Sequence, residues 1–264
     1  MKPTLNIAIT AARAAGQIIL RNYAHVDQLR PQTKQYNDFV SEVDQMAEQE
    51  IIATIRKAYP SHAILAEESG EHSGDEFQWI IDPLDGTTNF LHGFPQFSVS
   101  IALKHEKKLE VGVVYDPFKE ELFAAERGGG ATLNNRRIRV SKRTNLEGAL
   151  LGTGFPYREG QDLDGYLRTL RKILEQTTGI RRAGSAALDL AYVANGRLDG
   201  FWEFDLNAWD IAAGVLLIQE AGGLVSDTQG GHSYLESGDL VCANPKLFKT
   251  LLTIVNSALK SAQA

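Results

Sequence analysis

The segment DPLDGTTNF at residues 82–90 constrains the fold of this chain more than any other part of the sequence. It follows residues 77–81, whose aromatic and β-branched side chains are typical of a buried strand. Pro83 prevents a helix from running through this point, and Gly86 allows the backbone to turn. The sequence therefore predicts that two aspartates, three residues apart, lie where a strand ends in a loop.

This loop combines groups that bind metal ions with groups that bind anions. Asp82 and Asp85 can hold a hard divalent cation through their carboxylate oxygens. The amides of Gly86, Thr87 and Thr88 can hold an anion if a helix begins there. The alternative is a tight turn in which both aspartates cap backbone N–H groups, because aspartate is common in turns. The first interpretation predicts phosphate chemistry, whereas the second predicts a purely structural loop.

The composition limits the size, surroundings and partners of the chain. With 264 residues, 43% of them hydrophobic, it is large enough for one sizeable domain or two small ones. A formal net charge of −6 argues against broad nucleic-acid binding, although it permits a local basic patch. The single cysteine, Cys242, excludes an internal disulfide and suits a reducing cytosol. Because no apolar stretch approaches the roughly 18 residues that a membrane helix needs, we expect a soluble, cytoplasmic protein without a membrane partner.

Apolar periodicity predicts two different patterns along the chain. Helices are expected over 5–23 and 41–59, followed by an antiparallel meander of strands at 62–66, 77–81, 97–103, 109–115 and 121–125. Later, strands at 150–153, 198–203, 224–226 and 240–243 alternate with helices at 163–176, 185–194, 210–221 and from Pro245. The change predicts an N-terminal α+β subdomain, residues 1–146, that binds metal and phosphate. A C-terminal α/β subdomain, residues 147–264, would complete the metal site and the substrate pocket.

Three further acidic residues lie where a purely structural explanation is incomplete: Asp44, Glu67 and Asp210. Each has a structural alternative, since Asp44 completes a capping box with Ser41, Asp210 suits a helix N-terminus and Glu67 suits a solvated loop. Together with the two loop aspartates they offer only oxygen ligands, which indicates magnesium or manganese rather than zinc. The sequence leaves open whether these five carboxylates meet in space.

Two segments resemble signatures of the inositol monophosphatase family. Residues 82–90 resemble the first signature, and WDIAAG at 209–214, continuing to EAGG at 220–223, resembles the second. NDFV at 37–40, EES at 67–69 and GSAA at 184–187 also fit, so the resemblance spans nearly the whole chain and is closest to the bacterial SuhB-type members. It implies a layered α-β-α-β-α sandwich of the α/β (α+β) class, which the family shares with fructose bisphosphatases.

The resemblance also implies an activity and a set of metal ligands. The activity is the magnesium-dependent release of inorganic phosphate from myo-inositol monophosphate, sensitive to lithium and carried out by a homodimer. Glu67, Asp82 and the Leu84 carbonyl would hold one Mg²⁺, and Asp82, Asp85 and Asp210 would hold a second.

Catalytic and substrate-binding roles follow from the same resemblance. Thr87, paired with Asp44, would orient and help deprotonate the attacking water, and Glu67 is the other candidate base. The amides of Gly86 and Thr87 would hold the phosphate oxygens, and side chains of the second half, Glu203 among them, would bind the sugar alcohol. The full set of residues expected to bind the substrate is Leu84, Asp85, Gly86, Thr87, Arg181, Ala186, Glu203 and Asp210. The pair Arg181–Arg182 also fits a salt-bridged surface or a subunit interface.

Two alternatives stay open at this point. Another sugar phosphate or a nucleotide phosphate is the first, because Asp205 and Asn207 depart from the pattern of the animal enzymes. The second is a binding role, because bacterial members of this type are associated with a transcription factor in RNA polymerase antitermination complexes, where catalysis would be secondary. The basic residues at 136–143 could support partner contact, although a solvated hairpin explains them as well.

Overall fold

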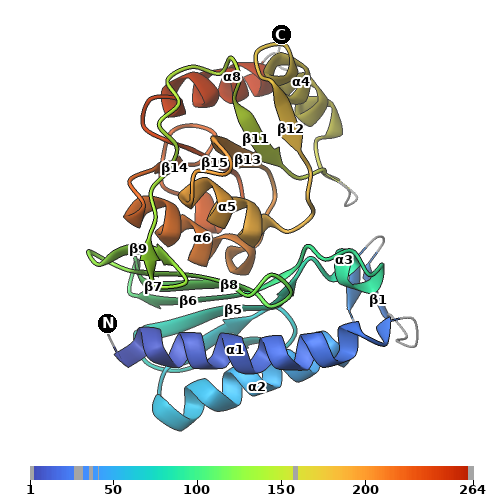
Figure 1. Cartoon of the computed structure of the whole chain (residues 1–264), viewed down its shortest axis with the longest axis vertical. Coiled ribbons are helices and arrows are strands. Elements are labelled where there is room, and N and C mark those ends of the chain that lie inside the picture. Colours follow the sequence, from blue (N-terminus) through green and yellow to red (C-terminus); the bar gives the residue numbers. More distant parts are fainter. Residues whose placement is uncertain (1–2, 27–31, 36–37, 41, 157–159, 261–264) are drawn as a thin grey trace.

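The computed structural model of this chain describes residues 3–26, 32–35, 38–40, 42–156 and 160–260, and for 32–35 and 38–40 the backbone alone. Layers of helix and sheet alternate through the molecule: helices α1 and α2, a large sheet, helices α5 and α6, a smaller sheet, and helices α4 and α8 (Figure 1). This arrangement confirms the α-β-α-β-α sandwich. None of the described helices has the length and apolar character needed to cross a bilayer.

The outermost helices of the N-terminal half bury one apolar face each. α1 (Pro3–Tyr23) places Leu5, Ala8, Ala12, Ala15 and Ile19 inward, and α2 (Glu42–Ala58) places Val43, Ala47, Ile51 and Ile55 inward. Both helices pack on the large sheet, where these side chains share a core with alternate residues of the central strands. Helical spacing of apolar residues therefore predicts these elements correctly.

The large sheet has eight strands in the order β10-β9-β8-β7-β6-β5-β3-β4. Its strands are β3 (Ala63–Ala66), β4 (Gly70–His72), β5 (Phe77–Asp85), β6 (Ser98–His105), β7 (Lys108–Asp116), β8 (Glu121–Glu126), β9 (Gly130–Leu133) and β10 (Arg136–Arg137). A separate two-stranded sheet joins β1 (Gln32–Gln35) and β2 (Asp38–Val40).

The predicted antiparallel meander is correct from β5 to β8 but wrong for β3, which pairs with β5 in parallel. The strand β9, which pairs with β8, was not predicted. The chain first turns outward from β3 into the edge strand β4, then crosses back to form β5 on the inner side of β3. In the parallel register Ala66 lies opposite Ile81. The residues that follow these two positions are Glu67 and Asp82. They consequently lie close together at the edge of the sheet where the parallel strands β3 and β5 end.

β5 continues further than predicted, through Pro83 to Asp85. Its pairing with β6 shifts between Asp82, opposite Ser100, and Asp85, opposite Ser98, so the strand bulges there. A bulge accommodates proline, which has no N–H for the ladder. Gly86 then adopts a left-handed conformation with φ of 93°, and the short helix α3 (Thr87–Leu91) begins. The predicted turn at Gly86 is correct.

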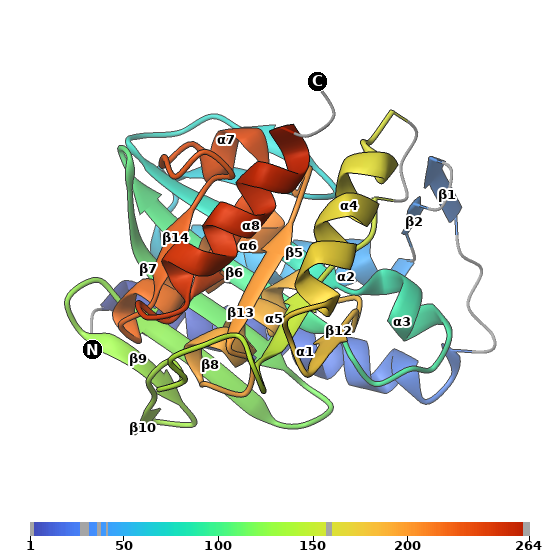
Figure 2. The ribbon, with the colours of Figure 1, turned by 90° about the horizontal axis from the view of Figure 1, so that it is seen from above.

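The C-terminal half contains a five-stranded sheet in the order β12-β11-β13-β15-β14. Its strands are β11 (Leu150–Thr153), β12 (Gly179–Arg181), β13 (Gly200–Glu203), β14 (Leu224–Ser226) and β15 (Leu240–Ala243). The helices of this half are α4 (Leu163–Leu174), α5 (Ala186–Ala194), α6 (Ala208–Glu220), α7 (Tyr234–Ser237) and α8 (Phe248–Lys260). α4 and α8 lie side by side over its outer face (Figure 2).

Helices α5 and α6 join the two halves by packing on both sheets. Their apolar side chains share one core with Ile80 and Val114 of the large sheet and with Phe201 and Cys242 of the small one. Cys242 is fully buried, and burial raises the pKa of its thiol, as expected of an inert cysteine. The predicted subdomain boundary between residues 146 and 147 stays a prediction. It falls between the strands of the large sheet and those of the small sheet, and the core around α5 and α6 connects the two sheets.

Candidate active site

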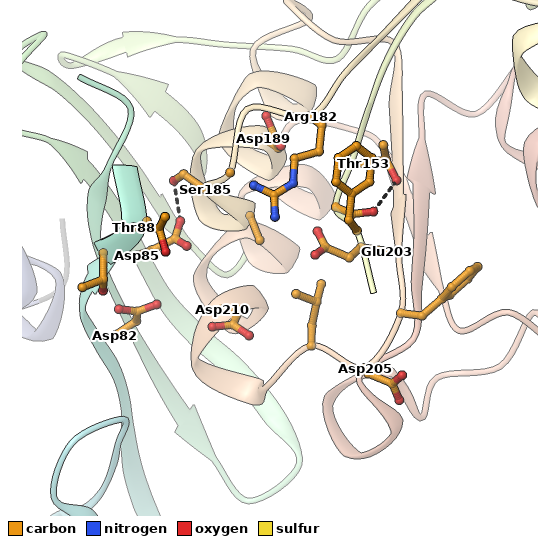
Figure 3. A pocket seen from close by; sticks show the side chains of 18 of the residues that line it. Asp82, Asp85, Thr88, Thr153, Arg182, Ser185, Asp189, Glu203, Asp205 and Asp210 are labelled. Carbon is orange, nitrogen blue, oxygen red and sulfur yellow. Dashed lines mark hydrogen bonds between the residues drawn. The ribbon is translucent and has the colours of Figure 1, made fainter. Parts of the chain in front are cut away.

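A cavity of about 320 Å³ opens between the two halves, at the edge where β3 and β5 end. Strands β11 and β13 and the N-terminal ends of α5 and α6 supply its other walls. Seven acidic residues of the described chain line it: Glu67, Asp82, Asp85, Asp189, Glu203, Asp205 and Asp210. Figure 3 shows Asp82 and Asp85 on one wall, Arg182 and Glu203 across the opening, and Asp210 between them.

The structure brings together most of the residues that the sequence singles out. Those that line the cavity are Glu67, Asp82, Leu84, Asp85, Gly86, Thr87, Ala186, Glu203 and Asp210. Asp44 lies behind this wall in α2, fully buried, and reaches the site through Thr87. Arg181 is exposed and does not line the cavity, whereas its neighbour Arg182 does. The motif at 37–40 and Ser41 lie outside the residues whose side chains are described.

Glu67 and Asp82 meet because their strands are parallel neighbours. The Glu67 amide donates to the Ile81 carbonyl at 3.1 Å, which extends the strand pairing to the cavity edge. Burial raises the pKa of Asp82 well above its ordinary value, and the nearby carboxyl groups of Glu67, Asp85 and Asp210 raise it further. Asp82 is thus a buried acid whose surroundings favour the neutral, protonated form, or a carboxylate whose charge a bound cation neutralises.

Asp85 is tied to the opposite half of the molecule. Its Oδ2 accepts hydrogen bonds from the Ser185 hydroxyl at 2.5 Å and from the Ala187 amide at 2.9 Å, both at the start of α5 (Figure 3). Burial raises the pKa of Asp85 to about 6, although these hydrogen bonds to Ser185 and Ala187 act in the opposite direction. The loop of the first signature and α5 are therefore held in a fixed relation.

Thr87 connects the cavity to α2. Its hydroxyl lies 2.8 Å from Oδ1 of Asp44 and 3.0 Å from the Leu84 carbonyl oxygen, and it can donate to either. Asp44 has no exposed surface, so its carboxyl group serves this contact rather than the solvent. The pairing of Thr87 with Asp44 agrees with the role that the resemblance implies.

Asp210 has a structural contact as well as a place in the cavity. Its Oδ2 accepts the Asn207 amide at 2.6 Å, which closes the first turn of α6. The helix-terminus explanation weighed from the sequence is therefore correct for this residue, but it accounts for one oxygen only. The residue also lines the cavity, so its role as a metal ligand stays a prediction beside the structural one.

The wall opposite the first signature is built from Glu203, Asp189 and Arg182. Asp189, in α5, is 2% exposed, and no hydrogen bond to its carboxyl group is found among the described residues. Burial raises the pKa of Glu203 well above its ordinary value, the charges of Asp189 and Asp210 add to this, and Arg182 opposes it. The Arg182 guanidinium also lies 5.1 Å from the ring centre of Phe155, an exposed side chain at the cavity rim.

Sequence reasoning missed two buried acids of this region, Glu48 and Asp189. Glu48 follows Asp44 by one helical turn on the buried face of α2, and this spacing was a usable signal. Asp189 falls on the buried face of α5 among alanines and leucines, where a carboxyl group is unexpected. Both stand apart from the segments that resemble family signatures, which explains why they were overlooked.

The donor set of the cavity fits a hard cation. Every candidate ligand is an oxygen, and among the described residues that line the cavity Arg182 alone is basic. Among the described residues, no three His, Cys, Asp or Glu side chains are placed to hold one metal ion together, so the carboxyl groups surround the cavity without converging on one point. The raised pKa of Asp82 nevertheless shows a surplus of negative charge that magnesium or manganese would neutralise.

The layered fold and the acidic cavity are those of a class of phosphatases. The inositol monophosphatase family model matches residues 1–260 of the chain, so the chain belongs to this family. A relative from Pseudomonas aeruginosa, named Nus factor SuhB, is 57% identical over 265 residues that cover 98% of both chains. A relative of the same name from Escherichia coli is 51% identical over 264 residues, or 99% of both chains.

Solved structures agree with this assignment. Extragenic suppressor protein SuhB from Bartonella henselae superposes with a TM-score of 0.94 at 45% identity, covering 96% of this chain and 98% of that one. Inositol monophosphatase from Anabaena gives a TM-score of 0.87 at 39% identity, covering 96% and 95%. The predicted family and its SuhB-type branch are confirmed.

Proposed function

We propose that this protein is a magnesium-dependent hydrolase that releases inorganic phosphate from myo-inositol monophosphate. The observation that carries the proposal is the parallel pairing of β3 and β5, which brings Glu67 and Asp82 to one edge of a cavity. Asp85 and Asp210 line the same cavity, beside the amides of Gly86 and Thr87. Acidic oxygen ligands and amide donors around one space suit a metal ion and a phosphate group together.

The residues that would hold magnesium are Glu67, Asp82, the Leu84 carbonyl, Asp85 and Asp210. When bound, magnesium supplies positive charge that stabilises the developing charge on the phosphate and favours deprotonation of water. Asp82 lies between the other acids, as the effect of Glu67, Asp85 and Asp210 on its pKa indicates, and would be shared by two ions.

Thr87 and Asp44 would orient the attacking water. Because the Thr87 hydroxyl can donate a hydrogen bond to Asp44 at 2.8 Å, its oxygen lone pairs stay available to accept a hydrogen bond from water. Glu67 is a second candidate base at the same edge of the sheet. Attack on phosphorus then breaks the bond to the alcohol oxygen and yields inorganic phosphate and the free alcohol.

The wall across the cavity would bind the alcohol. Glu203 and Asp189 present carboxyl groups that can accept hydrogen bonds from substrate hydroxyls, and Arg182, rather than Arg181, supplies donors. Ala186, at the start of α5, would contribute a backbone contact. A polyol phosphate satisfies this set of acceptors and donors better than a simple alcohol phosphate does.

One observation favours a different substrate within the same chemistry. Phe155 is 48% exposed at the cavity rim and its ring lies against the Arg182 guanidinium, so an aromatic and basic platform is present there. Such a platform suits a nucleotide base. Turnover of inositol monophosphate compared with adenosine bisphosphate, on wild type and Phe155→Ala, separates the two. A variant that loses only the nucleotide activity identifies the nucleotide phosphate as substrate.

We also propose a homodimer. On α4, Leu163, Leu167 and Leu174 are 51%, 48% and 52% exposed, although the opposite face of this helix is buried against α8. An apolar row of this kind on a helix that is already packed on its other side suits a second copy of the chain.

The relatives named Nus factor SuhB support a second role, as a partner in RNA polymerase antitermination complexes. The surface that would serve it is the basic segment at 136–143, in which Arg136 and Lys142 are exposed. Retention of RNA polymerase on immobilised protein tests this. Binding that survives Asp85→Asn but falls with a double Arg136→Ala and Lys142→Ala variant would establish a role separate from hydrolysis, and equal binding by the double variant would exclude this surface.

A further inference from the structure

Glu48 is a buried acid that holds the backbone directly beside a candidate metal ligand. It is 3% exposed on α2, and both of its carboxyl oxygens are used. Oε2 accepts the amide of Glu68 at 2.8 Å, and Oε1 accepts the amide of Ser69 at 2.9 Å. These two amides immediately follow Glu67, so the contact fixes the chain where Glu67 enters the cavity.

Helix α2 also contacts another part of the site, one helical turn before Glu48. Asp44 contacts the Thr87 hydroxyl on the loop of the first signature, and Glu48 contacts the loop after β3. Residues four apart on a helix lie on one face about 6 Å apart. The buried Val43, Ala47 and Ile51 fix α2 against the large sheet. A rigid helix thus sets the spacing between two loops that come from different strands.

A purely stabilising role for Glu48 is an incomplete explanation. Glu68 is only partly buried and Ser69 is exposed, so water could satisfy their amides without a protein partner. Placing a carboxyl group in the interior costs free energy of desolvation, and an apolar residue on this face of α2 would avoid that cost. What the carboxyl group adds is direction, because two hydrogen bonds from adjacent amides to one planar group allow a single orientation of the loop.

We propose that Glu48 is a positioning residue: by fixing the backbone after Glu67, it sets the position and orientation of the Glu67 side chain for metal binding. The inference rests on the proposed function, because it assigns Glu67 as a ligand. Partners that orient a metal ligand typically change metal affinity or activity about 10- to 100-fold when they are replaced.

The test compares Glu48→Gln with Glu50→Gln, a control that changes an exposed glutamate of the same helix. The amide side chain introduced by Glu48→Gln keeps one acceptor but turns an NH₂ group toward the second backbone amide. We expect about tenfold weaker Mn²⁺ binding by electron paramagnetic resonance and about tenfold weaker Mg²⁺ binding by calorimetry. The Mg²⁺ concentration for half-maximal phosphate release should rise by the same factor as the Mg²⁺ dissociation constant, while kcat at saturating Mg²⁺ stays near that of wild type. Amide exchange at Glu68 and Ser69 should accelerate, and Glu50→Gln should match wild type in all of these.

Metal binding by Glu48→Gln that equals that of wild type would overturn the inference. A loss of metal affinity that only parallels a fall in Tm would overturn it as well. If Glu48→Gln does not fold, Glu48→Asp, which keeps the charge but shortens the reach, carries the same expectation and the same contrary outcome. Failure of the proposed function would look different: wild type itself would bind neither ion and release no phosphate. Amide exchange would then still report whether Glu48 fixes this loop, with unchanged exchange in the variant counting against it.

Discussion

Asp82 combines an unfavourable effect on stability with a proposed role as a metal ligand. It is 2% exposed, and burial together with the carboxyl groups around it raises its pKa well above the ordinary value. A group whose folded-state pKa is raised stabilises the fold at low pH and loses that contribution as pH rises through the folded-state pKa. At neutral pH without metal, Asp82 therefore weakens the folded state, because in the unfolded chain its pKa lies well below 7.

Asp82→Asn should consequently abolish turnover without lowering stability. We expect phosphate release to fall more than about a hundredfold at saturating Mg²⁺, because a ligand shared by two ions matters more than an outer partner does. The Tm of the metal-free variant should equal or exceed that of metal-free wild type, because Asn is neutral and can still accept the Leu84 amide, which lies 3.0 Å from Asp82 Oδ1. Calorimetry and a phosphate assay measure both quantities, and near-normal activity would refute the assignment.

Gly154 provides a prediction for the opposite wall. A Cβ at this position would overlap the Glu203 carboxyl group, so Gly154→Ala must displace it. Losing a hydrogen bond to a charged group corresponds to roughly a tenfold or greater rise in KM. The Mg²⁺ requirement should stay unchanged, because four of the five proposed metal ligands, Glu67, Asp82, Leu84 and Asp85, lie on the opposite wall. Steady-state kinetics at several Mg²⁺ concentrations separate the two effects, and a shift in Mg²⁺ requirement with constant KM would contradict the placement of Glu203.

At the residue scale, the sequence predicted the members of the cavity well because they belong to recognisable segments. Arg181 was the choice from an adjacent pair, in which Arg181 ends β12 and Arg182 follows the strand. Only the structure decides which of the pair faces the cavity, and it is Arg182. The position of Glu48 on the buried face of α2 could be read from its spacing after Asp44, but its contact with the backbone amides of a distant loop could not.

At the scale of elements, the parallel pairing of β3 with β5 matters most. In an antiparallel arrangement Glu67 and Asp82 would emerge at opposite edges of the sheet, and no common site could form. Local apolar patterns identified both strands, yet strand order depends on pairings between distant residues and on the edge strand β4. For this reason the elements could be predicted and their direction could not.

A ring stack beside β3 gives this element a pH-dependent stability. His62 lies between Tyr59 and Phe77, with ring centres 4.6 and 4.9 Å away, and its Nδ1 accepts the Trp79 Nε1–H at 3.1 Å. Burial lowers the pKa of His62, although Asp75 and Glu76 act against this. The folded state thus binds fewer protons at this site than the unfolded state, so stability falls as pH drops below about 6.5.

His62→Gln should reduce this pH dependence while keeping an acceptor for Trp79. The free energy of unfolding of wild type should decrease more steeply between pH 7 and pH 5 than that of the variant, by at most about 1.4 kcal/mol per pH unit. His92→Gln, which changes an exposed histidine, is the matched control and should follow wild type. Urea denaturation at several pH values measures the slopes. Equal slopes for wild type and His62→Gln would show that His62 does not titrate differently on folding.

At the scale of the whole molecule, the site exists only because both halves contribute to it. Ser185 and Ala187 in the C-terminal half bind Asp85, and Asp210 and Glu203 complete the walls. The shared core around α5 and α6 keeps the halves together. Resemblance to the family predicted this layering, whereas composition and periodicity alone predicted only two successive patterns of elements.

The proposed homodimer can be tested by changing an exposed leucine on α4. Leu167→Lys should convert the proposed dimer to a monomer, because a lysine in an apolar interface costs desolvation free energy. Leu224→Lys changes a leucine that is 43% exposed on strand β14, away from α4, and should leave the dimer intact. Analytical ultracentrifugation gives the masses. A dimeric Leu167→Lys variant would exclude this face, and a monomeric wild type would exclude the dimer.

The most direct test of the whole account is phosphate release from myo-inositol monophosphate, measured with and without Mg²⁺ on wild type and on Asp85→Asn. Release by wild type should require Mg²⁺, and the variant should release none above background, because Asp85 is a proposed metal ligand and ties the loop to Ser185. Release by wild type in the presence of a chelator, or equal release by Asp85→Asn, would contradict this account.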